Sequence, residues 1–488
     1  MAIVILIVYF AFLMALALIV SRRATKREGA TEEEYFLASR KLPWWAIMFT
    51  MAASWTGISL LITFDRGYSD GISSVWIMGG PTVVATFILI FYAVRIRRLG
   101  SISQPQLFEW RYSKAVRLIL AILVAWYMVT WAASELVGIG DSFQAFFGLD
   151  WLPGLLIGTA IVLVYTMVGG FRAVIITDVI QYIFLAVVTV IFSIVALGKA
   201  GGWVGISRAA LEANKPEKLQ LMHNIGPNLA YIFSFTIAWI IEADIWQRFA
   251  SAKTARAART GAIVATVVHV PIYLIATLGG MAAVVLVPGL ETGVFPSLVK
   301  SLAGPVVAAL AFTGVIATVM SSADTSINSG ALTLTEDIYH QYINKKASQR
   351  TIVIAGWVTT AIVTILSLIV AWAGKDMLYI LWLAADILAA GAFIPVMVGL
   401  FWRRATNLGA ILSMIGGTIY TLIQFLHGLG AFPFPIIPKS FPLGEWPYYI
   451  IWGLGISLIL FLIGTLVSKP DAEKTRKFFD ELINKAAD

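Results

Sequence analysis

The sequence predicts an all-α polytopic membrane protein. Of its 488 residues, 59% are hydrophobic and 13% are charged, whereas soluble globular chains carry about 25% charged residues. Apolar runs of about 18 residues or more recur along the whole chain, and each is long enough to cross a bilayer as a helix. The sequence contains no Cys, which excludes disulfides, thiolate metal sites and cysteine catalysis.

The apolar runs divide into thirteen predicted spans. The first has no basic residue ahead of it and no small-residue cleavage pattern behind it, so we expect a membrane span and not a cleaved signal peptide. The predicted spans cover residues 2–21, 43–64, 76–94, 118–140, 151–169, 173–197, 228–246, 261–288, 305–336, 351–373, 377–401, 408–429 and 447–467.

The distribution of Lys and Arg predicts the orientation in the membrane. If the N-terminus lies outside, most of the 35 Lys and Arg residues fall in inner loops and in the tail, as the positive-inside rule requires. We therefore expect a multi-pass protein of the plasma membrane with an outer N-terminus and a cytoplasmic C-terminus. The net charge of +8 follows from this topology and indicates no nucleic-acid partner.

Two spans contain residues that do not suit a regular apolar helix. Small residues and glycine occupy residues 52–57 near the middle of the second span, and the seventh span ends in the polar stretch 241–248. Unwound backbone at membrane depth is tolerated where it faces protein, water or an ion. The two spans are five apart, and interrupted helices at matching places in two halves are typical of an inverted-repeat transporter.

The ninth span carries an unusual polar stripe. Its oxygens suit a small hard cation, but small hydroxyl residues also allow two helices to pack closely. The stripe alone supports both interpretations. At helical spacing, with the carboxylate of Asp324 beside them, its members are Thr318, Ser321, Ser322, Thr325, Asn328 and Ser329.

Seven motifs resemble, in the same order, those of the sodium/solute symporter family, which includes the sodium-driven sugar, proline, sialic acid and pantothenate carriers. The resemblance covers roughly residues 34–411, and a chance match of seven ordered motifs is improbable. The motifs are Leu42 to Trp45, Arg111 to Ser113, Gly169 to Gln181, Gln247 and Arg248, Ser321 to Ser326, Thr335 to Tyr339, and Gly399 to Thr406.

The resemblance implies a core of two inverted five-helix repeats, spans 2–6 and 7–11. The predicted segments are a first helix and loop (1–42), this core (43–404), two C-terminal helices (405–468) and a cytoplasmic tail with a short amphipathic helix (469–488). The resemblance also implies a sodium site between the second and ninth spans. Its ligands would be the carbonyls of Ala53, Thr56 and Thr318 and the hydroxyls of Ser321 and Ser322.

The chain departs from the family pattern at substrate positions. Leu60, Phe235 and Ala238 stand where sugar carriers have a glutamine, an asparagine and a tyrosine, so a hexose is not expected. Trp239 matches the family's tryptophan. Trp55 stands where proline carriers have an aspartate, which puts proline itself in doubt.

The solute pocket is predicted on the cytoplasmic side of Trp131 and Trp239, with Trp382 as a further aromatic candidate. Glu135 and Asp386 are the acidic residues expected nearest to it. Two interpretations of Glu135 stay open: an anchor for an ammonium or hydroxyl group, and a hydrogen bond between helices.

A second cation or proton site is predicted from Asp178, Ser321, Asp324 and Thr325. Family members that move two sodium ions use the aspartate that matches Asp178, and two carboxylates there would repel unless a cation or proton lay between them. The alternative is a gate, in which Asp178 bonds to the ninth span while a single sodium ion leaves.

These residues together predict a secondary active transporter that couples sodium to the symport of an amino acid, a small carboxylate or a vitamin. The alternatives are a proton-coupled symporter of the same fold, or a channel or transporter-like sensor. An enzyme is not expected, because the four His residues are scattered and no metalloprotease, esterase or P-loop motif occurs. The expected partners are the bilayer, the solute and one or two sodium ions, with no obligatory protein partner.

Overall fold

The computed structural model describes residues 2–28, 31–428, 430–438, 440–444 and 448–483, and helices make up most of this part of the chain. Nine helices in it are long and apolar enough to cross a membrane, and two bent pairs of helices raise the number to eleven. Val4–Val20 and Trp151–Val164 are shorter apolar helical runs. With these two, the described helices are compatible with the predicted thirteen spans.

The described part of residues 2–212 contains ten helices and turns besides η1. They are α1 (Ala2–Glu28), α2 (Glu32–Leu37), α3 (Trp44–Ser54), α4 (Gly57–Asp70), η2 (Ile72–Ser74), α5 (Val75–Leu99), α6 (Gln104–Arg111), α7 (Lys114–Phe147), α8 (Trp151–Lys199) and α9 (Gly202–Glu212). Short 3-10 turns also occur at η1 (Ala38–Arg40) and η3 (Pro216–Leu219).

The chain continues with α10 (Ile225–Ile240), α11 (Ala243–Ser251), α12 (Ala255–Leu286), α13 (Val294–Leu302), α14 (Pro305–Leu332), η4 (Thr333–Ile343), α15 (Gln349–Gly374), α16 (Met377–Phe401), α17 (Asn407–Gly428), α18 (Tyr449–Val467), α19 (Ala472–Arg476) and η5 (Lys477–Ile483). The segments η4 and η5 are π-helical.

The predicted breaks in the second and seventh spans are confirmed. α3 and α4 meet at an angle of 48°, and α10 and α11 meet at 43°. At the first break the packing favours a glycine at position 57, because an added Cβ would lie 2.2 Å from the Ser322 hydroxyl oxygen. Glycine therefore lets the start of α4 approach α14 closely.

α14 is the central helix of the bundle. The most apolar part of its span is 83% buried, more than in the other eight long spans among the described residues. It packs against α1, α7, α8 and α15. The stripe of hydroxyl and amide residues predicted on this span therefore faces protein, and not lipid.

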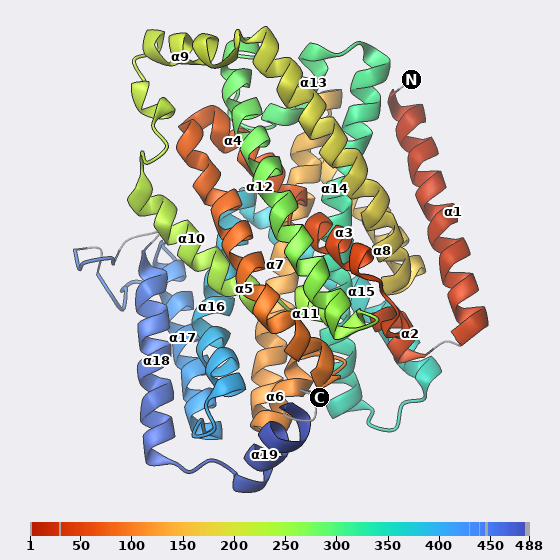
Figure 1. The fold of residues 1–488 in the computed structure, drawn as a ribbon, viewed down its shortest axis with the longest axis vertical. Helices are drawn as coiled ribbons and strands as arrows, with labels where there is room; N and C mark the ends of the chain where they lie inside the picture. The colour runs from red at the N-terminus through yellow and green to blue at the C-terminus, as the bar shows by residue number, and fades with distance from the viewer. Residues whose placement is uncertain (1, 29–30, 429, 439, 445–447, 484–488) are drawn as a thin grey trace.

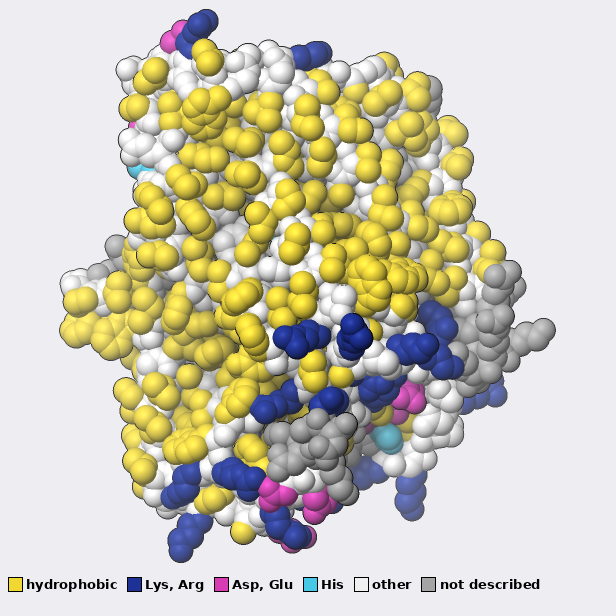
Figure 2. Space-filling view, viewed as in Figure 1, with side chains coloured by type: hydrophobic (Ala, Val, Ile, Leu, Met, Phe, Trp, Pro, Cys, Tyr) yellow, Lys and Arg dark blue, Asp and Glu magenta, His cyan; other side chains and the backbone are white. Residues whose placement is uncertain are grey.

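The ends of the bundle differ in composition. In Figure 1, the N-terminus, α9 and α13 lie at the upper end, whereas α6, α19 and the C-terminus lie at the lower end. α1 and α18 lie on opposite flanks of the bundle (Figure 1). Figure 2 shows hydrophobic side chains over most of the same face, with Lys and Arg gathered toward the lower end.

Some predicted boundaries change. The fifth and sixth predicted spans both lie in α8, and the ninth continues beyond residue 336 into η4. The tail is helical as expected, and Phe478 and Phe479 are buried, with the Arg111 guanidinium over both rings. Residues 1, 429 and 447, which bound predicted segments or spans, and residues 484–488 of the tail lie outside the described residues.

Candidate ion and solute site

The break between α3 and α4 faces the hydroxyl stripe of α14. The Ser322 hydroxyl donates to the Ala53 carbonyl at 3.0 Å, and the Ser321 hydroxyl donates to the Thr318 carbonyl at 2.8 Å. Thr56 lies in the break itself, between the end of α3 and the start of α4, and its backbone N–H donates to the Ala53 carbonyl.

The structure therefore brings the five predicted sodium ligands to one buried region. All of them are fully buried, and they offer neutral carbonyl and hydroxyl oxygens, which suit a small hard cation. The assignment of these oxygens to a sodium ion stays a prediction.

Glu135 of α7 reaches the same region from another side. Its Oε2 accepts a hydrogen bond from the backbone N–H of Ile58 at 2.9 Å, in the first turn of α4. A helix N-terminus favours a negative charge. A Cβ added at Gly57 would lie within 3 Å of both Glu135 Oε2 and the Ser322 hydroxyl oxygen, so both side chains approach one point. The bond between helices is present, and the role as a solute anchor stays a prediction.

The two breaks are joined by side chains. The Ser54 hydroxyl donates to Asp244 Oδ2 at 2.7 Å, and the Trp55 indole N–H donates to Glu242 Oε2 at 2.6 Å. The Tyr127 hydroxyl donates to the other oxygen of Glu242 at 3.2 Å. Both carboxylates are buried.

Glu242 was missing from the predicted site residues. It belongs to a polar stretch that marked the end of the seventh span, and a buried acid at membrane depth is itself a signal of function. Its partners come from α7 and from the first break, and local spacing along the sequence does not predict that approach.

Arg248 of α11 contacts Asp178 and Thr325, two of the four residues predicted for a second cation or proton site. Its guanidinium donates to the Thr325 hydroxyl at 2.8 Å and to Asp244 Oδ2 at 3.1 Å, and lies 3.5 Å from Asp178 Oδ2. Thr50 also donates to Asp178. A fully buried guanidinium is stable in such a place because several acceptors surround it.

This arrangement bears on the two interpretations of Asp178. Asp178 contacts the Arg248 guanidinium, which also donates to Thr325 of the ninth span, so this link between Asp178 and the ninth span is indirect and the gate stays a prediction. Ser321 and Asp324 are buried on the same helix. A second sodium ion or a proton at this place stays a prediction.

The predicted aromatic residues of the pocket form one buried cluster. The Trp239 ring lies 6.0 Å from Trp131, 5.2 Å from Phe235 and 5.4 Å from Trp55, measured between ring centroids. Trp382 lies 6.4 Å from Phe235. The cluster therefore reaches from the first break to α16.

The remaining predicted solute residues, Leu60, Ala238 and Asp386, are fully buried. Leu60 is fully buried in α4, and Ala238 accepts a hydrogen bond from the backbone N–H of Ile241 at the second break. Asp386 of α16 accepts a hydrogen bond from the Ser234 hydroxyl of α10. Asp386 thus links α16 to α10, the first helix of the second bent pair.

The sodium:solute symporter family model matches residues 35–417 of the chain. The chain belongs to this family. This symporter is 26% identical to a sodium/proline symporter of Staphylococcus aureus, over 99% of the chain and 94% of that relative. It is 25% identical to an osmoregulated proline transporter of Bacillus subtilis, over 91% of the chain and 92% of that relative.

Solved structures support the fold of the symporter. A substrate-bound, outward-open Na+-coupled sialic acid symporter superposes with a TM-score of 0.79 at 19% identity, covering 96% of this chain and 98% of the other. The Mhp1 transporter of the nucleobase-cation-symport-1 family superposes with a TM-score of 0.57 at 16% identity, covering 92% and 98%. These likenesses establish a transporter fold with two five-helix repeats.

Proposed function

We propose that this protein uses a sodium ion, bound between the first break and α14, to drive symport of a small organic solute. The ligands are Ala53, Thr56, Thr318, Ser321 and Ser322. The observation that carries the proposal is the 3.0 Å approach of the Ser322 hydroxyl to the Ala53 carbonyl. That approach joins a broken helix of one repeat to an intact helix of the other.

The solute carries an amine beside an apolar body, as an amino or imino acid does. Aromatic faces make up much of the cluster, and Glu135, Glu242 and Asp386 place carboxylates around it. Carboxylates attract an ammonium group and repel a solute that is only an anion. The proline transporters among the relatives favour this class.

Trp55 remains a departure from proline carriers, but the structure offers a compensation. The Trp55 indole donates to Glu242, so the second break supplies a carboxylate beside the position where those carriers have an aspartate. We therefore place the amine of the solute near Glu242. A small carboxylate without an amine is the less favoured solute class.

Coupling follows from the position of the ion. An ion held by α3, α4 and α14 stabilises the arrangement of the repeats that forms the solute cluster, so each ligand tightens the binding of the other by the same factor. A tenfold sodium gradient contributes about 1.4 kcal/mol, and about 100 mV adds about 2.3 kcal/mol per charge.

The lower end of Figure 1 would face the cytoplasm. The gathering of Lys and Arg there supports this orientation (Figure 2). The N-terminus would then lie outside the plasma membrane.

Uptake into proteoliposomes tests the function. An inward sodium gradient should concentrate labelled proline or another small amino acid above its outside level, whereas an equal potassium gradient should not. Accumulation driven by a proton gradient alone would instead establish the proton-coupled alternative. Flux of solute that only equilibrates would favour a channel.

A further inference from the structure

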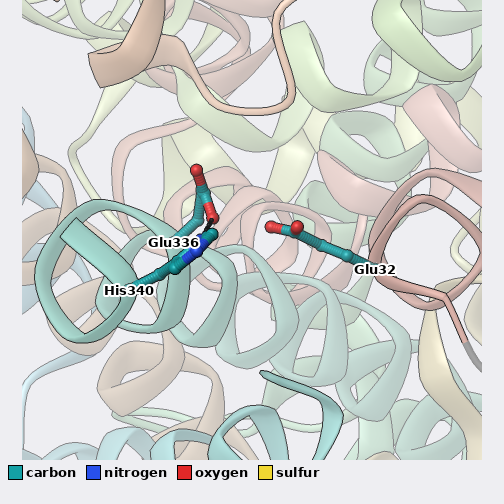
Figure 3. A group of neighbouring side chains, drawn as sticks. All are labelled: Glu32, Glu336 and His340. Atoms are coloured by element: carbon teal, nitrogen blue, oxygen red, sulfur yellow. Dashed lines mark hydrogen bonds and ion pairs between the residues drawn. The ribbon is translucent and has the colours of Figure 1, made fainter. Parts of the chain in front are cut away.

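Three side chains converge at the lower end of the bundle, away from the proposed sodium site. Glu32 comes from α2, and Glu336 and His340 come from η4, the π-helical continuation of α14 (Figure 3). One ligand atom of each lies within 4.8 Å of the others. π-helical segments frequently occur at functional sites.

The Glu32 carboxylate points to a missing positive partner. Glu32 is only 6% exposed, and its Oε1 makes no hydrogen bond with the described part of the chain. Figure 3 shows this carboxylate directed toward Glu336 and His340. A buried carboxylate oxygen without a hydrogen-bond donor is costly.

The neighbouring cation is already shared. Arg117 contacts Glu109 at 2.8 Å, Asp337 at 2.8 Å and Glu336 at 3.2 Å. Its single charge therefore serves three carboxylates before Glu32 is counted. On the other side, His340 Nδ1 lies 2.8 Å from Glu336 Oε2.

We propose that Glu32, Glu336 and His340 bind a divalent transition-metal ion of the Zn2+ class. Two carboxylate oxygens and an imidazole nitrogen are ligands that Zn2+ accepts, whereas Mg2+ and Ca2+ prefer oxygen alone. Two ligand atoms that each lie about 2.0–2.2 Å from one metal ion are at most about 4.4 Å apart. Small side-chain rotations therefore bring the three ligand atoms near enough to bind the same ion. The His340 side chain is 29% exposed, which leaves a solvent-facing side for a water ligand.

The metal would join α2 to the helix that carries the sodium hydroxyls. The Glu32 backbone N–H already donates to the Gln349 side chain of α15 at 2.8 Å. A metal bridge from Glu32 to η4 would therefore hold α2, α14 and α15 together at this end. Binding itself does not depend on the proposed transport function.

A shared proton is the rival way to balance these charges. Burial, together with the carboxylate of Glu336, raises the pKa of Glu32 to about 9. In that case Glu32 would hold a proton at neutral pH, and Zn2+ would find no site.

Metal binding to the purified full-length protein decides between the two. After treatment with a chelator, the protein is equilibrated with micromolar ZnCl2, and bound zinc and the melting temperature are measured. We expect one zinc ion per chain with raised melting temperature, and about tenfold or more weaker binding in His340→Ala and Glu32→Gln. Mg2+ should not substitute.

Matched controls are available nearby. Glu33→Gln alters the exposed neighbour of Glu32, which pairs with Arg40, and His427→Ala removes another partly buried histidine. Both should bind zinc as the wild type does. Wild-type protein that binds no zinc, or equal binding in wild type and His340→Ala, would overturn the proposal. If His340→Ala does not fold, Glu32→Gln and the wild-type stoichiometry still decide it.

Discussion

The two helix breaks have similar angles but different chemistry. The first break, at residues 55 and 56, presents backbone oxygens to the hydroxyl groups of α14. The second break carries the carboxylates Glu242 and Asp244, which accept hydrogen bonds from Ser54, Trp55 and Tyr127 in other parts of the bundle and, for Asp244, from Arg248 of its own helix. Neutral oxygens suit an ion that must bind and leave, whereas a carboxylate paired with a buried guanidinium, as Asp244 is with Arg248, helps to hold helices together. The difference agrees with the proposed ion site at the first break, and at the second break it separates Asp244, which pairs with Arg248, from Glu242, the carboxylate proposed to meet the amine of the solute.

The largest effect is expected from removing the buried guanidinium of Arg248 at the second break. Arg248→Met would leave Asp178 and Asp244 buried without the guanidinium, and breaking such a buried pair costs about 3–5 kcal/mol. We expect little folded protein, measured as yield and melting temperature. Arg256→Met, at an exposed position in α12, is the control. If Arg248→Met is as stable as this control, the guanidinium does not stabilise the second break.

A smaller effect is expected from crowding the ion site. In Gly57→Ala the new methyl group would press on the Ser322 hydroxyl and on Glu135, and overpacking costs about 1–3 kcal/mol. The sodium concentration for half-maximal uptake should rise about tenfold or more. Gly455→Ala in α18, where an added Cβ meets open space, should behave as the wild type. An unchanged sodium requirement in Gly57→Ala would remove this contact from the site.

Neutralising the acid of the second break should separate solute binding from sodium binding. Glu242→Gln keeps an oxygen for the Trp55 indole but loses the charge, and a hydrogen bond to a charged group contributes about 1.5–3 kcal/mol. We expect the half-saturating solute concentration to rise about tenfold, with sodium dependence nearly intact. Glu212→Gln, at the exposed end of α9, is the control. A variant with unaltered solute affinity would show that Glu242 does not meet the amine.

The smallest effect is expected from one link between the breaks. Ser54→Ala removes the hydrogen bond to Asp244, which retains Arg248 as a partner. The loss should be about 0.5–1.5 kcal/mol in unfolding free energy, seen as a modest drop in melting temperature. Ser69→Ala, near the exposed end of α4, should change less. A larger loss than in Arg248→Met would reverse the ranking.

The sequence predicted the local features of this molecule better than its long-range contacts. The bent spans and the hydroxyl stripe were predictable, because glycine and small polar residues interrupt apolar runs at fixed spacing. The bond from Trp55 to Glu242 joins residues 187 positions apart, and periodicity carries no information on such an approach. The same holds for Arg248 and its acceptors Thr50, Asp178 and Thr325, which lie on α3, α8 and α14. The second cation site stays a prediction, and its predicted residues did not include Arg248.

The central claim is a sodium ion held by the first break and by α14. A sodium titration of the melting temperature tests it without knowledge of the solute, because a bound ion stabilises the folded state. The comparison uses purified wild type, Ser322→Ala and Ser413→Ala. Ser413 is a buried serine that bonds to Ser457 between α17 and α18, away from the proposed site.

Sodium should raise the melting temperature of the wild type and of Ser413→Ala at the same concentration, and potassium should not. Ser322→Ala should need about fivefold more sodium, as the loss of a contact contributing about 1 kcal/mol implies. If Ser322→Ala titrates with sodium as the wild type does, the ion does not bind between the first break and α14.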